Sequence, residues 1–412
     1  MQTSKGHLTY CSNIHPGETW SDHFEKLKEN IPLIKKKVSP IEPFGIGLRL
    51  ANTASLELRK QENLEAFREW LADNDCYVFT MNGFPYGGFH NTVVKDQVHA
   101  PDWLSSDRVA YTIRLAQILA TLLPEGVDGG ISTSPLSYKF WHKEDQWSNV
   151  FETATFNLLQ VVDQLLQIKK VTGKLIHIDI EPEPDGLLGN GTEFLQWYMR
   201  YLLPLGIPYI QDRYEINEDE ASSVIREHIQ LCYDVCHFAV GYEDHAHMIE
   251  QLRSLGIKTG KIQISAALKS VVPESPGERK NFIEAFKQFN EPVYLHQVVA
   301  RKKDKKLLRY PDLNVALDDA LNPEVTEWRA HYHVPLFISS YGLLQSTQSD
   351  IEKVLAIHDH SMFTFHLEIE TYTWEVLPDE MRLPIAESII REIQWVVDII
   401  KHESTRTGQA YA

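Results

Sequence analysis

The feature that most constrains the fold of this chain is a regular alternation of short apolar segments with longer amphipathic ones. Apolar residues three or four positions apart, such as Leu27, Ile31 and Ile34, predict the helices. The short apolar segments predict eight strands, at residues 8–14, 44–50, 77–82, 130–134, 175–181, 231–236, 261–266 and 363–370. Strands that alternate with helices form parallel sheets, and eight such strands close into a barrel.

We therefore expect residues 1–412 to form a single α/β domain, a (β/α)8 TIM barrel. A doubly wound open sheet is the alternative, but no predicted strand is followed by a GxGxxG phosphate loop. Residues 270–344 interrupt the alternation, because they are too many for one connection between a strand and a helix. We interpret them as an insertion after the seventh strand, near the barrel mouth, or as a small subdomain.

Composition excludes several classes of partner. The formal net charge of -17 disfavours binding to nucleic acid, and with it an endonuclease on this fold. Residues 1–20 lack the apolar core of a signal peptide, and no segment approaches the roughly 20 apolar residues that span a bilayer. The four cysteines match neither a zinc knuckle nor a thioredoxin motif. We expect a cytoplasmic protein with no nucleic-acid partner and no membrane insertion.

The fifth predicted strand carries acidic residues that must point into the barrel. His177, Asp179 and Glu181 alternate with isoleucines. The outward face of a barrel strand contacts helices, so the isoleucines belong there and the polar residues belong inside. A buried charge is costly unless it is paired or bound to a cation. Glu181, nearest the end of the strand, is the natural ligand for a cation.

The sixth and eighth predicted strands add carboxylates at the same end of the barrel. Asp234 shares a predicted strand face with Cys236, and His237 lies where that strand gives way to a loop. Glu368 and Glu370 both point inward from the eighth strand. Either of them suits a cation, and Glu368 is also a candidate for binding substrate.

These carboxylates predict a divalent metal site. Ion pairs between strands are the alternative, but no lysine or arginine shares the inward faces of the same strands. Sites rich in oxygen suit Mn, Mg or Co, and Zn is also compatible. We predict a metal bound by Glu181, Asp234, Gln263 and Glu370, with Gln263 coming from the seventh strand.

Other candidate substrate-binding residues follow the first and third strands or lie in the insertion. The loop after the third strand is rich in glycine and aromatic residues, which is typical of a cover that closes over a ligand. The guanidinium of Arg329 is the best candidate for an anionic group of a substrate. The candidates are His15, Asn82, His90, His296 and Arg329.

The order of these residues resembles that of the xylose isomerase-like TIM barrels, which include sugar isomerases and ketose 3-epimerases. The matching elements are Glu181, the run Asp234-x-x-His237, and Glu370. The resemblance implies metal ligands from the fifth, sixth, seventh and eighth strands, the seventh supplying a histidine. Here Gln263 stands at the position of that histidine, which is a departure from the family pattern.

Longer strings, among them NGFPYGGFH, DVCHFAVGYED and HLEIETYTWEVLP, resemble the EboE family of the bacterial Ebo cluster. That resemblance extends over nearly the whole chain. It implies a role in the processing or traffic of a secondary metabolite, with other Ebo-cluster proteins as partners. The chemical step of that family is not fixed by the resemblance.

Two functions follow. The first is a metal-dependent isomerase or epimerase of a small polyhydroxylated metabolite, a sugar or cyclitol. In it Glu181 and Glu370 serve as general base and acid, and His237 orients a hydroxyl of the substrate. The second is a non-catalytic metabolite-binding or accessory protein, which the loss of a ligand at Gln263 favours. The sequence leaves open whether a reaction is catalysed.

Overall fold

The central sheet of the protein is a parallel barrel. The computed structural model describes residues 1–88, 93–374, 377 and 384–409, the last eight of these as helical backbone only. Each of the eight predicted strands is present, with bounds that differ by a few residues. The barrel strands are β2 (Gly6–Tyr10), β3 (Phe44–Arg49), β4 (Cys76–Asn82), β5 (Gly129–Thr133), β6 (Ile176–Ile180), β7 (Ile229–Asp234), β8 (Thr259–Ile264) and β15 (His366–Ile369).

The strands follow one another around the barrel in the order β2-β15-β8-β7-β6-β5-β4-β3, and each hydrogen-bonded pair in this series is parallel. The two end strands, β2 and β3, meet through the side chain of Thr9. Its hydroxyl donates to Gly45 O at 2.7 Å and accepts from Gly47 N at 3.0 Å. The fold is thus a nearly closed α/β TIM barrel, which confirms the predicted fold class.

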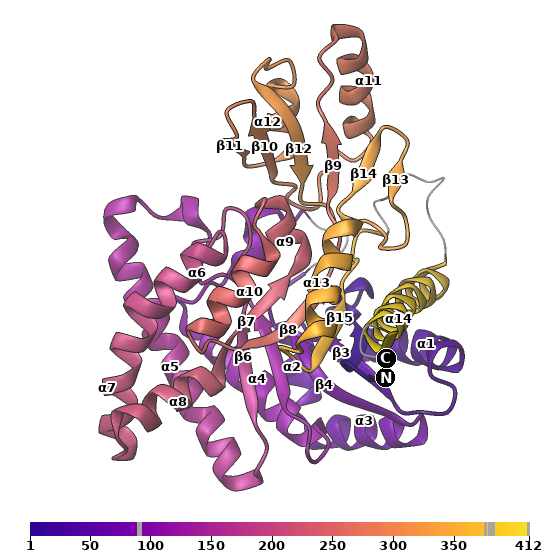
Figure 1. The fold of residues 1–412 in the computed structure, drawn as a ribbon. Helices are drawn as coiled ribbons and strands as arrows, with labels where there is room; N and C mark the ends of the chain where they lie inside the picture. The colour runs from indigo at the N-terminus through magenta and orange to yellow at the C-terminus, as the bar shows by residue number, and fades with distance from the viewer. Residues whose placement is uncertain (89–92, 375–376, 378–383, 410–412) are drawn as a thin grey trace.

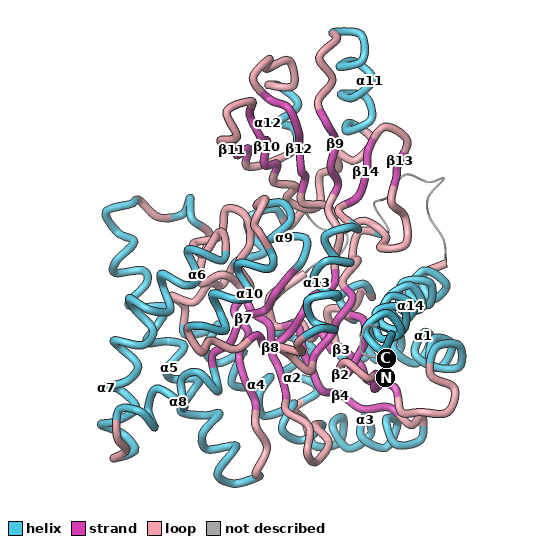
Figure 2. Tube along the Cα trace, in the orientation of Figure 1, coloured by secondary structure: helices cyan, strands magenta, loops and turns pink. Residues whose placement is uncertain are grey.

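Helices surround the strands on the outside (Figures 1 and 2). Within the described residues, none of them is both long enough and apolar enough to cross a membrane. The helices are α1 (Trp20–Val38), α2 (Asn52–Leu58), α3 (Gln61–Asp73), α4 (Ser106–Leu122), α5 (Trp147–Thr172), α6 (Gly191–Trp197), α7 (Leu203–Tyr214), α8 (Glu218–His228), α9 (Val235–Val240), α10 (His245–Ser254), α13 (Gln348–His360) and α14 (Ile385–Gln409).

A second, antiparallel sheet stands over one end of the barrel (Figure 1). It follows the seventh barrel strand and contains the residues interpreted as an insertion, 270–344. Thr347 N donates to Ala267 O at 2.8 Å where the chain leaves this sheet. Its strands are β9 (Leu268–Val271), β10 (Val298–Lys302), β11 (Leu307–Tyr310), β12 (Val325–Ala330), β13 (Ser340–Tyr341) and β14 (Leu344–Ser346). Two helices, α11 (Pro276–Lys287) and α12 (Leu313–Asp318), lie in the connections between them.

The sixth barrel strand, β7, ends earlier than the apolar pattern predicts. Asp234 is its last residue, and Cys236 lies in the short helix α9. The carboxylate of Asp234 accepts a hydrogen bond from His237 N at 3.0 Å and so caps the first turn of that helix. The prediction that Asp234 and Cys236 share a strand face is therefore wrong, because the cap ends the strand.

The barrel interior below the mouth holds a buried charge pair. His177 Nδ1 lies 2.6 Å from Asp179 Oδ1, and both side chains are buried. Gly260 makes room for this pair, since a Cβ atom there would lie 1.8 Å from Asp179 Oδ1. Burial lowers the pKa of His177, but Asp179 and Asp128 outweigh it and raise the pKa to about 9.

We expect a His177→Gln variant to lose more stability at pH 6 than at pH 10. The pKa of His177 is raised above its ordinary value of 6.5, so its stabilising contribution is complete below pH 6.5 and is lost as the pH rises through about 9. The variant should cost about 2–3 kcal/mol at pH 6 and clearly less at pH 10. Urea unfolding at both pH values measures this, and an equal cost at both would contradict the charge pair.

Candidate metal centre

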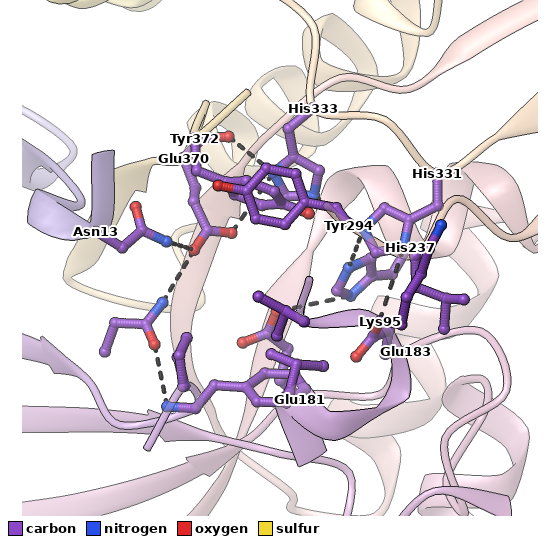
Figure 3. A pocket seen from close by; sticks show the side chains of 16 residues that line it. Asn13, Lys95, Glu181, Glu183, His237, Tyr294, His331, His333, Glu370 and Tyr372 are labelled. Atoms are coloured by element: carbon purple, nitrogen blue, oxygen red, sulfur yellow. Dashed lines mark hydrogen bonds and ion pairs between the residues drawn. The ribbon is translucent and has the colours of Figure 1, made fainter. Parts of the chain in front are cut away.

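A cavity of about 50 Å³ opens at the mouth of the barrel, between the carboxyl ends of the strands and the second sheet. Its walls include Asn82, Glu181 and Glu370 from the barrel and His331 and His333 from the insertion. Figure 3 shows these glutamates and histidines turned towards the same space. That volume accommodates ions and a few water molecules. The cavity lies where TIM barrels carry their active sites.

Three carboxylates converge at the base of this cavity. One oxygen each of Glu181, Asp234 and Glu370 lies within 4.8 Å of the other two, and all three side chains are buried. They come together because β6, β7, β8 and β15 are neighbours in the barrel. We call these three residues the acid cluster.

The side chain of Gln263, on β8, sits among these carboxylates. Its Nε2 donates to Asp234 Oδ2 at 2.9 Å, to Glu181 Oε1 at 3.1 Å and to Glu370 Oε2. An amide nitrogen carries only two hydrogens, so it cannot bond fully to three carboxylates, and it brings no charge to neutralise them. The four residues predicted to bind a metal are thus in mutual contact.

Further hydrogen bonds fix the orientation of the acid cluster. Glu370 Oε1 accepts from Asn13 Nδ2 at 2.7 Å and from Asn82 Nδ2 at 2.9 Å. Asp234 Oδ1 accepts from Ser265 Oγ at 2.7 Å. Glu181 differs, because its Oε2 is buried without a hydrogen-bond partner among the described residues. One oxygen of the cluster, Glu181 Oε2, is therefore left without a hydrogen bond among the described residues.

The electrostatics of the acid cluster favour a cation. Burial raises the pKa of Glu181 well above its ordinary value, and the charges of Glu370 and Asp234 raise it further. Burial and the charge of Asp234 likewise raise the pKa of Glu370. Among the residues that the structure describes, no lysine or arginine forms an ion pair with these three. The oxygen donors, their burial and the unused oxygen fit a divalent cation.

Glu368 does not belong to the acid cluster. Its Oε2 lies 2.6 Å from Lys261 Nζ, and both side chains are fully buried. The inference that the inward carboxylates lack a basic partner is therefore wrong for Glu368, since β8 supplies one. Glu368 does not reach the cavity to bind substrate, and Glu370 is the acid of the eighth barrel strand that joins the cluster.

Two predicted substrate-binding histidines lie behind the cavity wall. His15 Nε2 is 2.8 Å from the hydroxyl of Tyr10, and the ring is buried. His296 is held between Glu291, at 2.6 Å from its Nε2, and the carbonyl of His331, at 2.9 Å from its Nδ1. Neither side chain is among the described residues that line the cavity.

Arg329, predicted to bind an anionic group, also points elsewhere. Its Nε donates to Glu327 at 2.9 Å, and its guanidinium lies 4.1 Å from the centre of the Tyr242 ring. A charge already paired and stacked outside the cavity does not meet a substrate there. Asn82 does line the cavity, whereas His90 lies outside the described residues.

Two histidines that the sequence did not assign to the site, His331 and His333, lie beside His237 in the cavity wall. His237 Nε2 lies 3.2 Å from His331 Nε2, which in turn lies 3.2 Å from His333 Nε2. The spacing of His331 and His333 was visible in the sequence, but their position depends on how the second sheet packs on the barrel. His237, predicted to orient a hydroxyl of the substrate, lines the cavity, and its Nε2 lies next to that of His331.

No protein-family model matches the chain, and no curated protein matches its sequence. Solved structures that match include L-ribulose 3-epimerase, with 9% identity, a TM-score of 0.49, and coverage of 99% of this chain and 98% of the other. The IOLI protein with a zinc atom has 12% identity and a TM-score of 0.47, covering 96% and 99%. A probable 3-DHS dehydratase from Bacillus anthracis has 10% identity and a TM-score of 0.45, covering 95% and 98%.

Proposed function

We propose that this chain is a divalent-metal-dependent isomerase or epimerase of a small polyhydroxylated compound, a sugar or a cyclitol. The observation that carries the proposal is the convergence of Glu181, Asp234 and Glu370 around the amide of Gln263. When bound there, a divalent cation would polarise a carbonyl oxygen and the neighbouring hydroxyl of the substrate. The oxygen ligands suit Mn²⁺, Mg²⁺ or Co²⁺, and Zn²⁺ is compatible.

In this proposal Glu181 and Glu370 have different tasks. Glu370 accepts hydrogen bonds from Asn13, Asn82 and Gln263, which hold it in place as a ligand. Glu181 keeps Oε2 unpartnered at the edge of the cavity. We assign the transfer of the substrate proton to Glu181, since a general base needs an oxygen that is not already engaged.

The resemblance to the EboE family supports a place for this reaction in the processing or traffic of a secondary metabolite, with other Ebo-cluster proteins as partners. A cytoplasmic location belongs to the same proposal, in keeping with four cysteines that form no disulfide.

One observation favours the alternative, a metabolite-binding or accessory protein without catalysis. The amide nitrogen of Gln263 already lies within hydrogen-bond distance of all three carboxylates and shares its two hydrogens among them, which allows the acid cluster to persist without an ion. In that case the polar side chains of the cavity would bind a ligand, and none of them would transfer a proton to or from it. Metal uptake separates the two functions.

The test uses Glu181→Gln and Glu370→Gln, with Glu392→Gln as a matched control. Glu392 is also buried and accepts from Thr371 Oγ1 at 2.8 Å, but it does not line the cavity. We expect wild type to take up Mn²⁺ and to exchange a carbon-bound hydrogen of a sugar or cyclitol with D₂O. Glu181→Gln should slow the exchange about 10²–10⁴-fold.

Proton NMR measures the exchange, and electron paramagnetic resonance measures bound Mn²⁺. Glu370→Gln should lose Mn²⁺, whereas Glu392→Gln should behave like wild type. The proposal is wrong if Mn²⁺ binding survives in both Glu181→Gln and Glu370→Gln. Uptake of Mn²⁺ by wild type without any exchange across a panel of ketoses, aldoses and cyclitols would favour the binding protein.

A further inference from the structure

Three histidines form a second group of metal-ligating atoms beside the acid cluster. His237 comes from α9 at the barrel mouth, and His331 and His333 come from the segment that follows β12. All three rings are buried, with exposed fractions of 5%, 4% and 1%. We call these residues the histidine subsite. It spans the boundary between the barrel and the second sheet.

The backbone fixes the tautomer of two of these rings. His237 Nδ1 lies 3.0 Å from Pro182 O, and His333 Nδ1 lies 3.0 Å from Glu370 O. A carbonyl oxygen only accepts, so each Nδ1 carries the hydrogen. In the neutral ring the lone pair is then on Nε2.

The third ring is fixed by an amide. His331 Nδ1 lies 2.7 Å from Gln297 Oε1. The orientation of that amide is itself set, because Gln297 Nε2 donates to Pro184 O at 2.9 Å. The Nδ1 of His331 therefore donates to an oxygen, and its Nε2 also carries a lone pair. Histidines that bind metals almost always donate their second nitrogen in this way.

The lone pairs of these rings point at one another. The Nε2 of His331 lies 3.2 Å from the Nε2 of His237 and 3.2 Å from the Nε2 of His333. With each hydrogen on Nδ1, no proton lies between these nitrogens, so the neutral rings repel. Zinc with Zn–N bonds of about 2.0–2.1 Å holds neighbouring tetrahedral ligands about 3.3 Å apart. The separations of His331 Nε2 from the other two nitrogens match that value.

An acidic side chain completes the group. Glu183 is buried, and its Oε2 has no hydrogen-bond partner among the described residues. A carboxylate oxygen of Glu183 and ring nitrogens of His237 and His331 lie within 4.8 Å of one another. Three nitrogens and one oxygen form a ligand set that zinc commonly accepts.

We propose that the histidine subsite binds a transition-metal ion, Zn²⁺ in preference to Mg²⁺ or Mn²⁺, through His237, His331 and His333 with Glu183 as the fourth ligand. This ion is separate from one held by the acid cluster, whose ligands are oxygens. It also joins the two parts of the protein, since Glu183 and His237 belong to the barrel and His331 and His333 follow β12 of the second sheet. The inference stands on the histidine geometry and does not require the proposed isomerase activity.

The experiment uses the full chain, stripped of metal by dialysis against a chelator and titrated with Co²⁺ and then Zn²⁺. Co²⁺ bound by nitrogen ligands in a four-coordinate site gives strong visible absorption, and Zn²⁺ should displace it. His331→Gln and His333→Gln should each weaken binding by at least about 100-fold, because loss of even a supporting hydrogen bond costs 10–100-fold. His228→Gln is the matched control, since His228 is also buried and its Nδ1 lies 2.7 Å from Ile176 O.

Two further variants keep the test decisive. Gln297→Met removes the partner of His331 Nδ1 and should weaken Co²⁺ binding about 10–100-fold even if the direct variants fold poorly. Glu370→Gln disables the acid cluster and should leave the Co²⁺ absorption in place. If the proposed function is wrong, Mn²⁺ binding or hydrogen exchange is therefore absent, while the Co²⁺ absorption of the histidine subsite remains.

Crystals soaked in Zn²⁺ give an independent readout through anomalous scattering. We expect a peak among His237, His331 and His333. The inference is overturned if the strong visible absorption of bound Co²⁺ is the same in wild type, His331→Gln and Gln297→Met, or is missing from wild type. A zinc peak confined to the acid cluster would overturn it as well.

Discussion

Replacing Lys261 by methionine is expected to destabilise the protein by about 3–5 kcal/mol, the usual cost of removing one partner of a buried ion pair. Lys261 Nζ lies 2.6 Å from Glu368 Oε2 inside the barrel, and neither side chain is exposed. Without the lysine, Glu368 would be a buried carboxylate whose Oε1 already lacks a hydrogen-bond partner among the described residues. Urea unfolding at pH 7 measures the loss.

A double variant separates the ion pair from the volume of the side chain. Lys261→Met combined with Glu368→Met replaces both charges by apolar groups of similar shape and should recover most of the loss. Lys26→Met is the surface control, because Lys26 pairs with Glu29 at 2.8 Å on the exposed face of α1. Its loss should cost less than about 1 kcal/mol. A double variant as unstable as Lys261→Met alone would show that the charge pair is not the cause.

The alternation of apolar segments was enough to predict the barrel, because parallel strands covered by helices are apolar along their outward faces. The end of β7 could not be read from the same pattern. Val235 and Cys236 continue the apolar run, yet the carboxylate of Asp234 caps a helix there. A cap is a local hydrogen bond, and apolar periodicity does not report it.

The acid cluster could be predicted because strand alternation and strand order are both visible in the sequence. Glu181 and Glu370 directly follow β6 and β15, Asp234 is the last residue of β7, and Gln263 lies on β8, between β7 and β15. Lys261 was missed although it alternates with Gln263 on β8 and so faces inward by the same rule. Its partner Glu368 lies on the neighbouring strand β15, so the pair cannot be recognised within either strand alone.

The histidine subsite could not be predicted from spacing. His331 and His333 are two residues apart, but they meet His237 only because the segment after β12 packs against the barrel mouth. There Val334 N donates to Ala266 O at 3.0 Å. His237 and His331, whose rings meet, are 94 positions apart, and their contact depends on how the insertion docks. The same docking carries Arg329 away from the cavity.

Replacing Gln263 by methionine is expected to cost about 3–5 kcal/mol in the absence of metal. The amide of Gln263 is the shared donor to Glu181, Asp234 and Glu370, and a hydrogen bond to a charged group contributes about 1.5–3 kcal/mol. Without the amide, the repulsion among the three buried carboxylates would no longer be offset by these hydrogen bonds. Unfolding in the presence of a chelator measures this cost.

Saturating Mn²⁺ should then narrow the gap between Gln263→Met and wild type to about 1–2 kcal/mol. A cation that binds only the folded state adds about 4 kcal/mol at a thousand times its dissociation constant. The gain is larger in the variant, because in wild type the cation must displace the amide of Gln263 from the carboxylates. Gln230→Met is the control, since Gln230 is a buried glutamine on β7 whose Nε2 donates to Glu227 O at 2.8 Å, away from the cavity. Its smaller cost should not change with Mn²⁺. If Mn²⁺ stabilises neither wild type nor Gln263→Met, the acid cluster is an amide-bridged structural group, and a cation has no place in it.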